Sequence, residues 1–153
     1  MRQTPAKPAK QTTHTFHPNL NTRASTLGRC AENLVIWFLK NKNWRIIARN
    51  YASNDGEIDI IAQKKGADID DIDTIIFVEV KSRSNPRSLA PEIRVSEKKR
   101  RRIIAASLFY MSAHPKYKVV YHYDIASVTL TRGHPPSIHY LSNAFCAKDP
   151  FGW

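Results

Sequence analysis

The sequence predicts an α/β domain in which a mixed β-sheet is flanked by helices. Apolar residues recur with a helical period between residues 26 and 42, and again after residue 96. Between these segments, residues 44–81 hold three β-branched runs separated by turns, and a further run covers residues 118–130. Three strands in hairpin succession, followed by a crossover helix and a fourth strand, predict a sheet with antiparallel and parallel neighbours.

The first predicted helix covers residues 26–42 and has one buried face. Its apolar residues follow the spacing i, i+3, i+4, i+7 and i+8, in the order Ala31, Leu34, Val35, Phe38 and Leu39. Ser25 or Thr26 is the expected N-cap. Glu32 borders the apolar stripe, so its carboxylate is expected beside the core. The helix dipole by itself also favours an acid near a helix start.

Three strands are predicted over residues 44–51, 57–63 and 74–81. The first two are joined by a turn that contains Asp55-Gly56, a strong hairpin signal. The second and third are joined by residues 64–73, a segment rich in aspartate that we expect to be solvated.

The second and third strands carry charged residues among apolar ones. Residues two apart in a strand share a face, so Glu57 points the same way as Asp59, and Glu79 the same way as Lys81. A charge in an otherwise apolar strand is costly unless it is paired or binds a metal. If these strands are neighbours, Asp59, Glu79 and Lys81 meet.

A long loop, a second helix and a fourth strand complete the predicted domain. The loop covers residues 82–95, and Ser96 caps a helix that runs to about Ala113. The first turn of this helix holds three cations, Lys98, Lys99 and Arg100, although the helix dipole disfavours positive charge there. Cations and free amides at a helix start together favour a phosphate ligand.

Composition and the chain ends indicate the partner and the compartment. The 24 basic and 13 acidic residues give a net charge of +11, which favours a polyanionic partner, with nucleic acid as the first candidate. The domain is expected over residues 25–130, after a flexible basic arm at 1–24 and before an irregular extension at 131–153 that packs on or near it. No membrane span or secretory signal is expected. Cys30 and Cys146 are interpreted as free thiols in a reducing cytoplasm.

If Asp59, Glu79 and Glu32 converge, their carboxylates must become protonated, spread apart or bind a cation. Three carboxylates in close proximity repel one another, and their all-oxygen ligation selects a hard ion such as Mg²⁺ or Mn²⁺. Lys81 would hold an attacking water or stabilise the charge that develops on phosphorus. This arrangement predicts a phosphodiesterase site.

The same residues carry a resemblance to a known family. The matching positions are Gly28, Glu32, Arg49-Asn50, Gly56-Glu57-Ile58-Asp59, Phe77-Val78-Glu79-Val80-Lys81, Arg83 and Lys99. In order and spacing they resemble the YraN-like family of uncharacterised bacterial proteins, which is similar to the restriction-endonuclease-like fold and to archaeal Holliday junction resolvases. The resemblance covers about residues 28–128 and implies a restriction-endonuclease-like core in the order α-β-β-β-α-β.

The resemblance also implies roles for individual residues. Asp59 and Glu79 would be metal ligands, assisted by the Val80 carbonyl, with Glu32 as a further acidic ligand. Lys81 would be the catalytic lysine, and Glu57 would support the site. The expected nucleic-acid-binding residues are Arg83, Arg87, Lys98, Lys99 and Arg100.

Three functional hypotheses follow. The first is a metal-dependent endonuclease that acts on DNA, including branched or otherwise structured DNA. The second is a non-catalytic nucleic-acid-binding protein that retains the fold, although acids in the middle of a basic surface would repel phosphate. The third is a domain in which Asp59, Glu79 and Lys81 form a structural ion pair. A homodimer would suit cleavage of a junction at two places, but the sequence identifies no interface.

Overall fold

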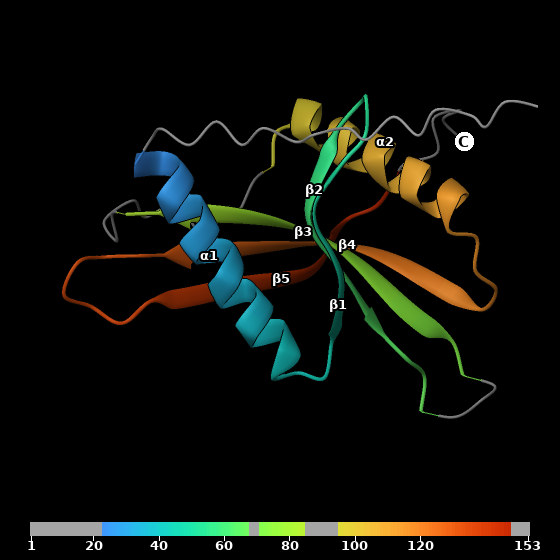
Figure 1. Ribbon diagram of the computed structural model, residues 1–153, viewed down its shortest axis with the longest axis horizontal. Coiled ribbons are helices and arrows are strands. Elements are labelled where there is room, and N and C mark those ends of the chain that lie inside the picture. Colours follow the sequence, from blue (N-terminus) through green and yellow to red (C-terminus); the bar gives the residue numbers. More distant parts are fainter. Residues whose placement is uncertain (1–22, 68–70, 85–94, 148–153) are drawn as a thin grey trace, which may run out of the picture.

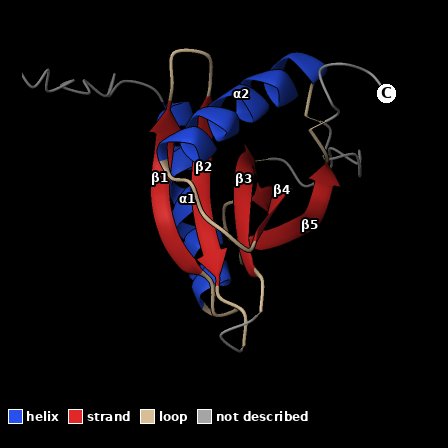
Figure 2. Ribbon diagram, turned by 90° about the vertical axis from the view of Figure 1, so that its right-hand side faces the viewer, coloured by secondary structure: helices blue, strands red, loops and turns tan. Residues whose placement is uncertain are grey.

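A computed structural model describes residues 23–67, 71–84 and 95–147 (Figure 1). The elements are α1 (Arg23–Lys40), β1 (Arg45–Ala52), β2 (Glu57–Lys64), β3 (Asp73–Arg83), α2 (Glu97–Ala113), β4 (Val119–Thr129) and β5 (Ser137–Phe145). The strands form one five-stranded mixed sheet, with α1 against one face and α2 against the other (Figures 1 and 2). The predicted α/β architecture is confirmed.

The strands lie in chain order across the sheet. The pairs β1–β2, β2–β3 and β4–β5 are antiparallel, whereas β3 and β4 are parallel. The parallel pair extends from Asp73 opposite Val119 to Arg83 opposite Thr129. A parallel connection requires a crossover, and α2 supplies it. Within the described part of the chain, no helix is long and apolar enough to cross a membrane.

Each face of the sheet has its own hydrophobic core. On one face, Ala31, Val35 and Leu39 of α1 are fully buried against β2, β3 and β4, as the helical stripe predicts. On the other face, Ile103 and Tyr110 of α2 are buried against the sheet. The two faces together enclose β2 and β3 between helices, which explains why these strands are almost wholly apolar.

The buried face of α2 differs from the expected stripe. The helical spacing predicts an inner stripe of Ile103, Ile104, Ser107, Leu108 and Met111. In the structure the Leu108 residue is 54% exposed, and Tyr110 is buried instead. The Tyr110 ring meets the rings of Tyr51 and Phe77 edge to face. An aromatic residue buries more area than leucine and gains from these ring contacts, so it sets the rotation of the helix.

Part of the segment that the sequence predicts to be irregular, after residue 131, forms the strand β5. This edge strand pairs with β4 from Ser137 opposite Thr129 to Phe145 opposite Tyr123. The alternation of partly buried and exposed residues in β5 is short: Ile138 and Tyr140 are partly buried, and most of the other residues are exposed. The Tyr140 ring packs on Phe38 of α1, and its hydroxyl donates to Asp124 Oδ2 at 2.6 Å.

The N-cap of α2 provides a test of the local structure. Ser96 Oγ accepts a hydrogen bond from the Lys99 backbone N–H at 3.3 Å, as predicted. We expect Ser96→Ala to lower the free energy of unfolding by about 1 kcal/mol in urea denaturation. The control is Ser112→Ala at the other end of α2, where Oγ donates to the Phe109 carbonyl and the expected change is under about 0.5 kcal/mol. Equal losses in both variants would contradict the capping role.

Candidate functional site

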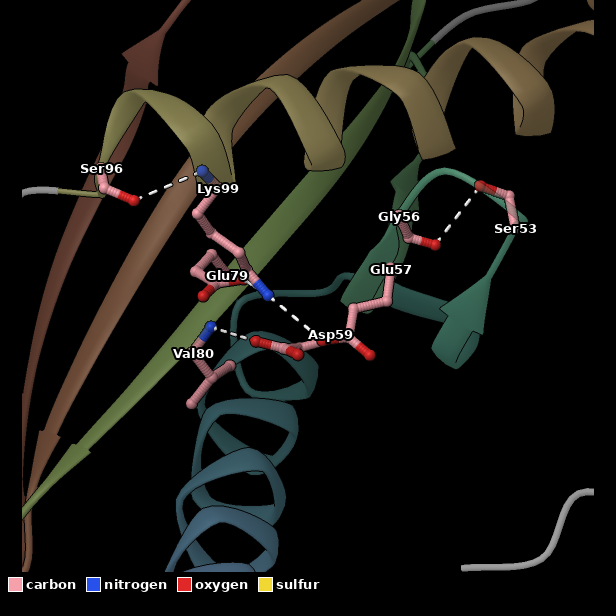
Figure 3. Close-up of polar contacts among 8 residues, drawn as sticks. All are labelled: Ser53, Gly56, Glu57, Asp59, Glu79, Val80, Ser96 and Lys99. Carbon is pink, nitrogen blue, oxygen red and sulfur yellow. Dashed lines mark hydrogen bonds and ion pairs between the residues drawn. The ribbon is translucent and has the colours of Figure 1, made fainter.

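The site lies where β2 and β3 stop pairing. Their register ends at Ile60 opposite Val78, although both strands continue beyond that point. At the next position, Asp59 Oδ2 accepts a hydrogen bond from the Val80 N–H at 2.6 Å (Figure 3). A side chain therefore takes the place of a carbonyl as the partner of this amide, and it places a carboxylate between the two strands.

A second carboxylate and a lysine lie beside Asp59. Glu79 is only 7% exposed and follows Phe77 on the face of β3 that α2 covers. Lys99 Nζ lies 3.1 Å from Glu79 Oε2 and 3.4 Å from Glu57 Oε1 (Figure 3). The contact with Glu79 is an ion pair without hydrogen-bond geometry, because Glu79 Oε2 is buried and has no hydrogen-bond partner. The structure thus brings one cation into contact with two carboxylates, those of Glu79 and Glu57, beside Asp59.

The electrostatics of the cluster follow from burial and like charges. Burial raises the pKa of Asp59 to about 7, and the charge of Glu79 acts in the same direction. The Val80 N–H and the Lys99 ammonium oppose this rise, and Glu32 adds to it. For Lys99, burial lowers the pKa, but the charges of Glu79 and its neighbours outweigh burial and raise it overall. At neutral pH Lys99 is therefore charged, and Asp59 is partly protonated.

Contact between α2 and the β1–β2 turn fixes the position of Lys99. The turn is closed by a hydrogen bond of 2.8 Å from the Ser53 N–H to the Gly56 carbonyl. Gly56 is buried, and a Cβ at this position would overlap the carbonyl oxygen of Arg102. Glycine is required here because the backbones of the turn and of α2 approach so closely. Lys99 lies one helical turn before Arg102 and faces Glu57, which directly follows Gly56.

Glu32 is linked to β1. Its Oε2 accepts a hydrogen bond from Asn50 Nδ2 at 3.3 Å and lies 3.5 Å from Arg49 Nη2. Asn50 has a φ of 47°, a left-handed conformation that asparagine tolerates better than most residues. In the described residues, no group of three His, Cys, Asp or Glu side chains is gathered to hold a metal ion. The role of Glu32 as a ligand therefore stays a prediction.

The other predicted site residues occupy different environments. Lys81 is partly buried in β3, two residues after Glu79 and opposite Ser127 of β4. Arg83 ends β3 and is partly buried. Lys98 is exposed, whereas the Arg100 guanidinium lies 5.4 Å from the centroid of the Phe145 ring. Arg87 lies outside the described residues.

Sequence reasoning missed the partners of Lys99. The basic run predicts that Lys99 faces a phosphate, but in the structure it faces two carboxylates. Its match to a family position was the only available signal, and that signal does not specify a contact. The pairing of Arg49 and Asn50 with Glu32 was likewise not predicted from their place on the first strand.

Together, these features define an α/β protein in which a buried glutamate, Glu79, and a partly buried aspartate, Asp59, lie at the point where two central strands separate. Residues 31–128 match the uncharacterised protein family UPF0102, and the chain belongs to this family. This confirms the YraN-like family that the sequence motifs predicted. The matched range includes Glu32, Asp59, Glu79 and Lys99.

Relatives from several bacteria cover most of the chain. The UPF0102 protein of Geobacter metallireducens is 32% identical over 120 residues, which are 78% of this chain and 92% of the relative. The UPF0102 protein of Syntrophus aciditrophicus is 36% identical over 115 residues, which are 75% of this chain and 83% of the relative. The UPF0102 protein of Trichlorobacter lovleyi is 31% identical over 131 residues, which are 84% of this chain and 96% of the relative.

Proposed function

We propose that this protein is a metal-dependent endonuclease that hydrolyses phosphodiester bonds in DNA. The observation that carries the proposal is the pair of Asp59, which is partly buried, and Glu79, which is buried, between separating strands in a chain with a net charge of +11. The overall positive charge attracts a polyanion. Two carboxylates in this place would weaken a surface that only binds phosphate, whereas a metal-dependent hydrolytic site uses them as ligands.

The acidic pair fits a hard divalent cation. Its donors are all oxygen atoms, Glu79 Oε2 is buried without a hydrogen-bond partner, and the pKa of Asp59 is raised to about 7. Mg²⁺ is commonly bound through one or two carboxylates and several waters, so two side chains are sufficient. Asp59 and Glu79 would hold Mg²⁺ or Mn²⁺, with the Val80 carbonyl and Glu32 as further predicted ligands. Such an ion would polarise the phosphodiester and lower the pKa of a water bound to it.

Cations of the chain would act on the phosphate itself. Lys81, two residues beyond Glu79 on the same strand, would stabilise the negative charge that develops on phosphorus. Lys98, Lys99 and Arg100 at the start of α2, with Arg83 at the end of β3, would position the DNA backbone. The resemblance to Holliday junction resolvases makes branched DNA the first substrate to test, by analogy at the level of the fold. A homodimer would present two such sites to a junction.

Cleavage of a panel of DNA structures tests the proposal. Linear, nicked, flapped and four-way DNA, and a matching RNA, would be incubated with Mg²⁺, Mn²⁺ or a chelator, and the products resolved on denaturing gels. We expect products from at least one DNA structure with either metal, and none with the chelator.

A different outcome would favour the non-catalytic hypothesis. If every DNA stays intact with both metals, the proposed activity is contradicted. Affinity that falls steeply with salt under the same conditions would then assign the basic surface to nucleic-acid binding, because counterion release makes such binding salt-dependent.

A further inference from the structure

We propose that Lys99 is an internal counter-ion that competes with the divalent cation for Glu79, and that a DNA phosphate draws it away. This inference rests on the proposed function and adds a mode of regulation to it. In the metal-free protein, the Lys99 ammonium would offset negative charge on Glu79 and Glu57. Binding of DNA would then make the carboxylates available, so the metal would bind more tightly when substrate is present.

The contacts of Lys99 support its role as a counter-ion that competes with the metal for Glu79. Its ammonium group lies 3.1 Å from Glu79 Oε2 and 3.4 Å from Glu57 Oε1, next to the Asp59 carboxylate that the Val80 amide binds (Figure 3). Its side chain is 24% exposed and that of Glu79 is 9% exposed. A full positive charge at this distance repels a second cation, most strongly where solvent screening is weak.

The place of Lys99 in the fold supports its transfer from Glu79 to a DNA phosphate. Lys99 lies in the first turn of α2, where its backbone amide is capped by Ser96 and the neighbouring Lys98 is exposed. A cation in this turn is opposed by the helix dipole, so only the carboxylates hold it there. A phosphate at the helix start offers Lys99 a second anionic partner. The flexible lysine side chain can exchange one partner for the other without movement of the backbone.

Metal affinity in the absence of DNA tests the competition. Mn²⁺ binding would be measured by calorimetry for the wild type, Lys99→Met and Lys99→Gln, after thermal melts have shown that the variants fold. We expect both neutral variants to bind Mn²⁺ at least about tenfold more tightly than the wild type. Lys99→Arg keeps the charge and is expected to stay within about threefold of the wild type.

The matched control is Arg101→Met, which removes one charge from the exposed face of the same helix. Arg101 pairs with Glu97, away from the cluster. We expect its Mn²⁺ affinity to change less than about twofold, since exposed charges are screened. Equal affinity for wild type and the neutral Lys99 variants would overturn the inference while leaving the metal site intact. Absence of Mn²⁺ binding in every form would instead contradict the proposed function.

The coupling is tested with a short phosphorothioate duplex that resists hydrolysis. We expect the duplex to tighten Mn²⁺ binding to the wild type several-fold more than it tightens binding to Lys99→Met. By linkage, Mn²⁺ should strengthen duplex binding by the same factor. An equal effect of the duplex on both proteins would show that Lys99 does not carry the coupling.

Discussion

Replacement of Glu79 with glutamine is expected to lower the DNA cleavage rate at least about a thousandfold. The substitution keeps the shape of the side chain but removes a charge that would hold the metal ion. It also leaves Lys99 with Glu57 as its remaining paired carboxylate, so the cation would stay near the site. The rate would be measured under single-turnover conditions on the preferred DNA, with saturating Mg²⁺.

The matched control is Glu97→Gln in the first turn of α2. Glu97 is exposed and lies 3.4 Å from Arg101. Loss of this surface pair is expected to change the rate less than about twofold, because exposed ion pairs contribute little. If Glu79→Gln cleaves DNA as fast as the wild type, the acidic pair is not the catalytic site.

Replacement of Asp59 with asparagine is expected to abolish activity and to stabilise the metal-free protein at alkaline pH. The pKa of Asp59 is raised from 3.8 to about 7 by burial and by Glu79. Well below pH 3.8 the carboxyl is protonated in both the folded and the unfolded state, and at pH 4 the difference between the two states is still small. As the pH rises from 4 to 7, the unfolded state ionises first, so the wild type loses stability until the folded state has also ionised. Asparagine does not titrate and keeps an acceptor for the Val80 N–H.

Urea denaturation at pH 4 and pH 8, with chelator present, measures this effect. The pKa shift sets a ceiling of about 4 kcal/mol, and solvation around the partly exposed site should reduce the gain to about 1–3 kcal/mol at pH 8. At pH 4 wild type and variant should be nearly equal. Asp55→Asn, in the exposed turn, is the control and should show no such dependence. A gain that is the same at both pH values would contradict the raised pKa.

Local sequence patterns were sufficient to predict the acidic pair. The period-2 alternation places Asp59 and Glu79 on inward positions of two strands, and the Asp55-Gly56 turn makes the first two strands a hairpin. Both features depend on residues close together in the chain. The first helix could be predicted for the same reason, because its buried stripe is a local periodicity.

Features that depend on long-range packing could not be predicted. The rotation of α2 is set by Tyr110 against Phe77, and its position by the backbone contact at Gly56. Together these decide that Lys99 meets Glu79. β5 was missed because its alternation is short, directly follows Pro135-Pro136, and gains its burial mainly from contacts with β4 and α1.

The contact between Gly56 and Arg102 means that the β1–β2 turn sets how closely α2 approaches the candidate site. Any side chain larger than hydrogen at position 56 would force the turn and α2 apart and so disturb the position of Lys99, although Gly56 itself takes no part in the ion pair of Glu79 and Lys99. Changes in this turn could therefore tune the balance between lysine and metal without altering any charged residue. For the proposed metal site, substitutions in this turn would offer a way to change metal affinity without replacing a charged residue.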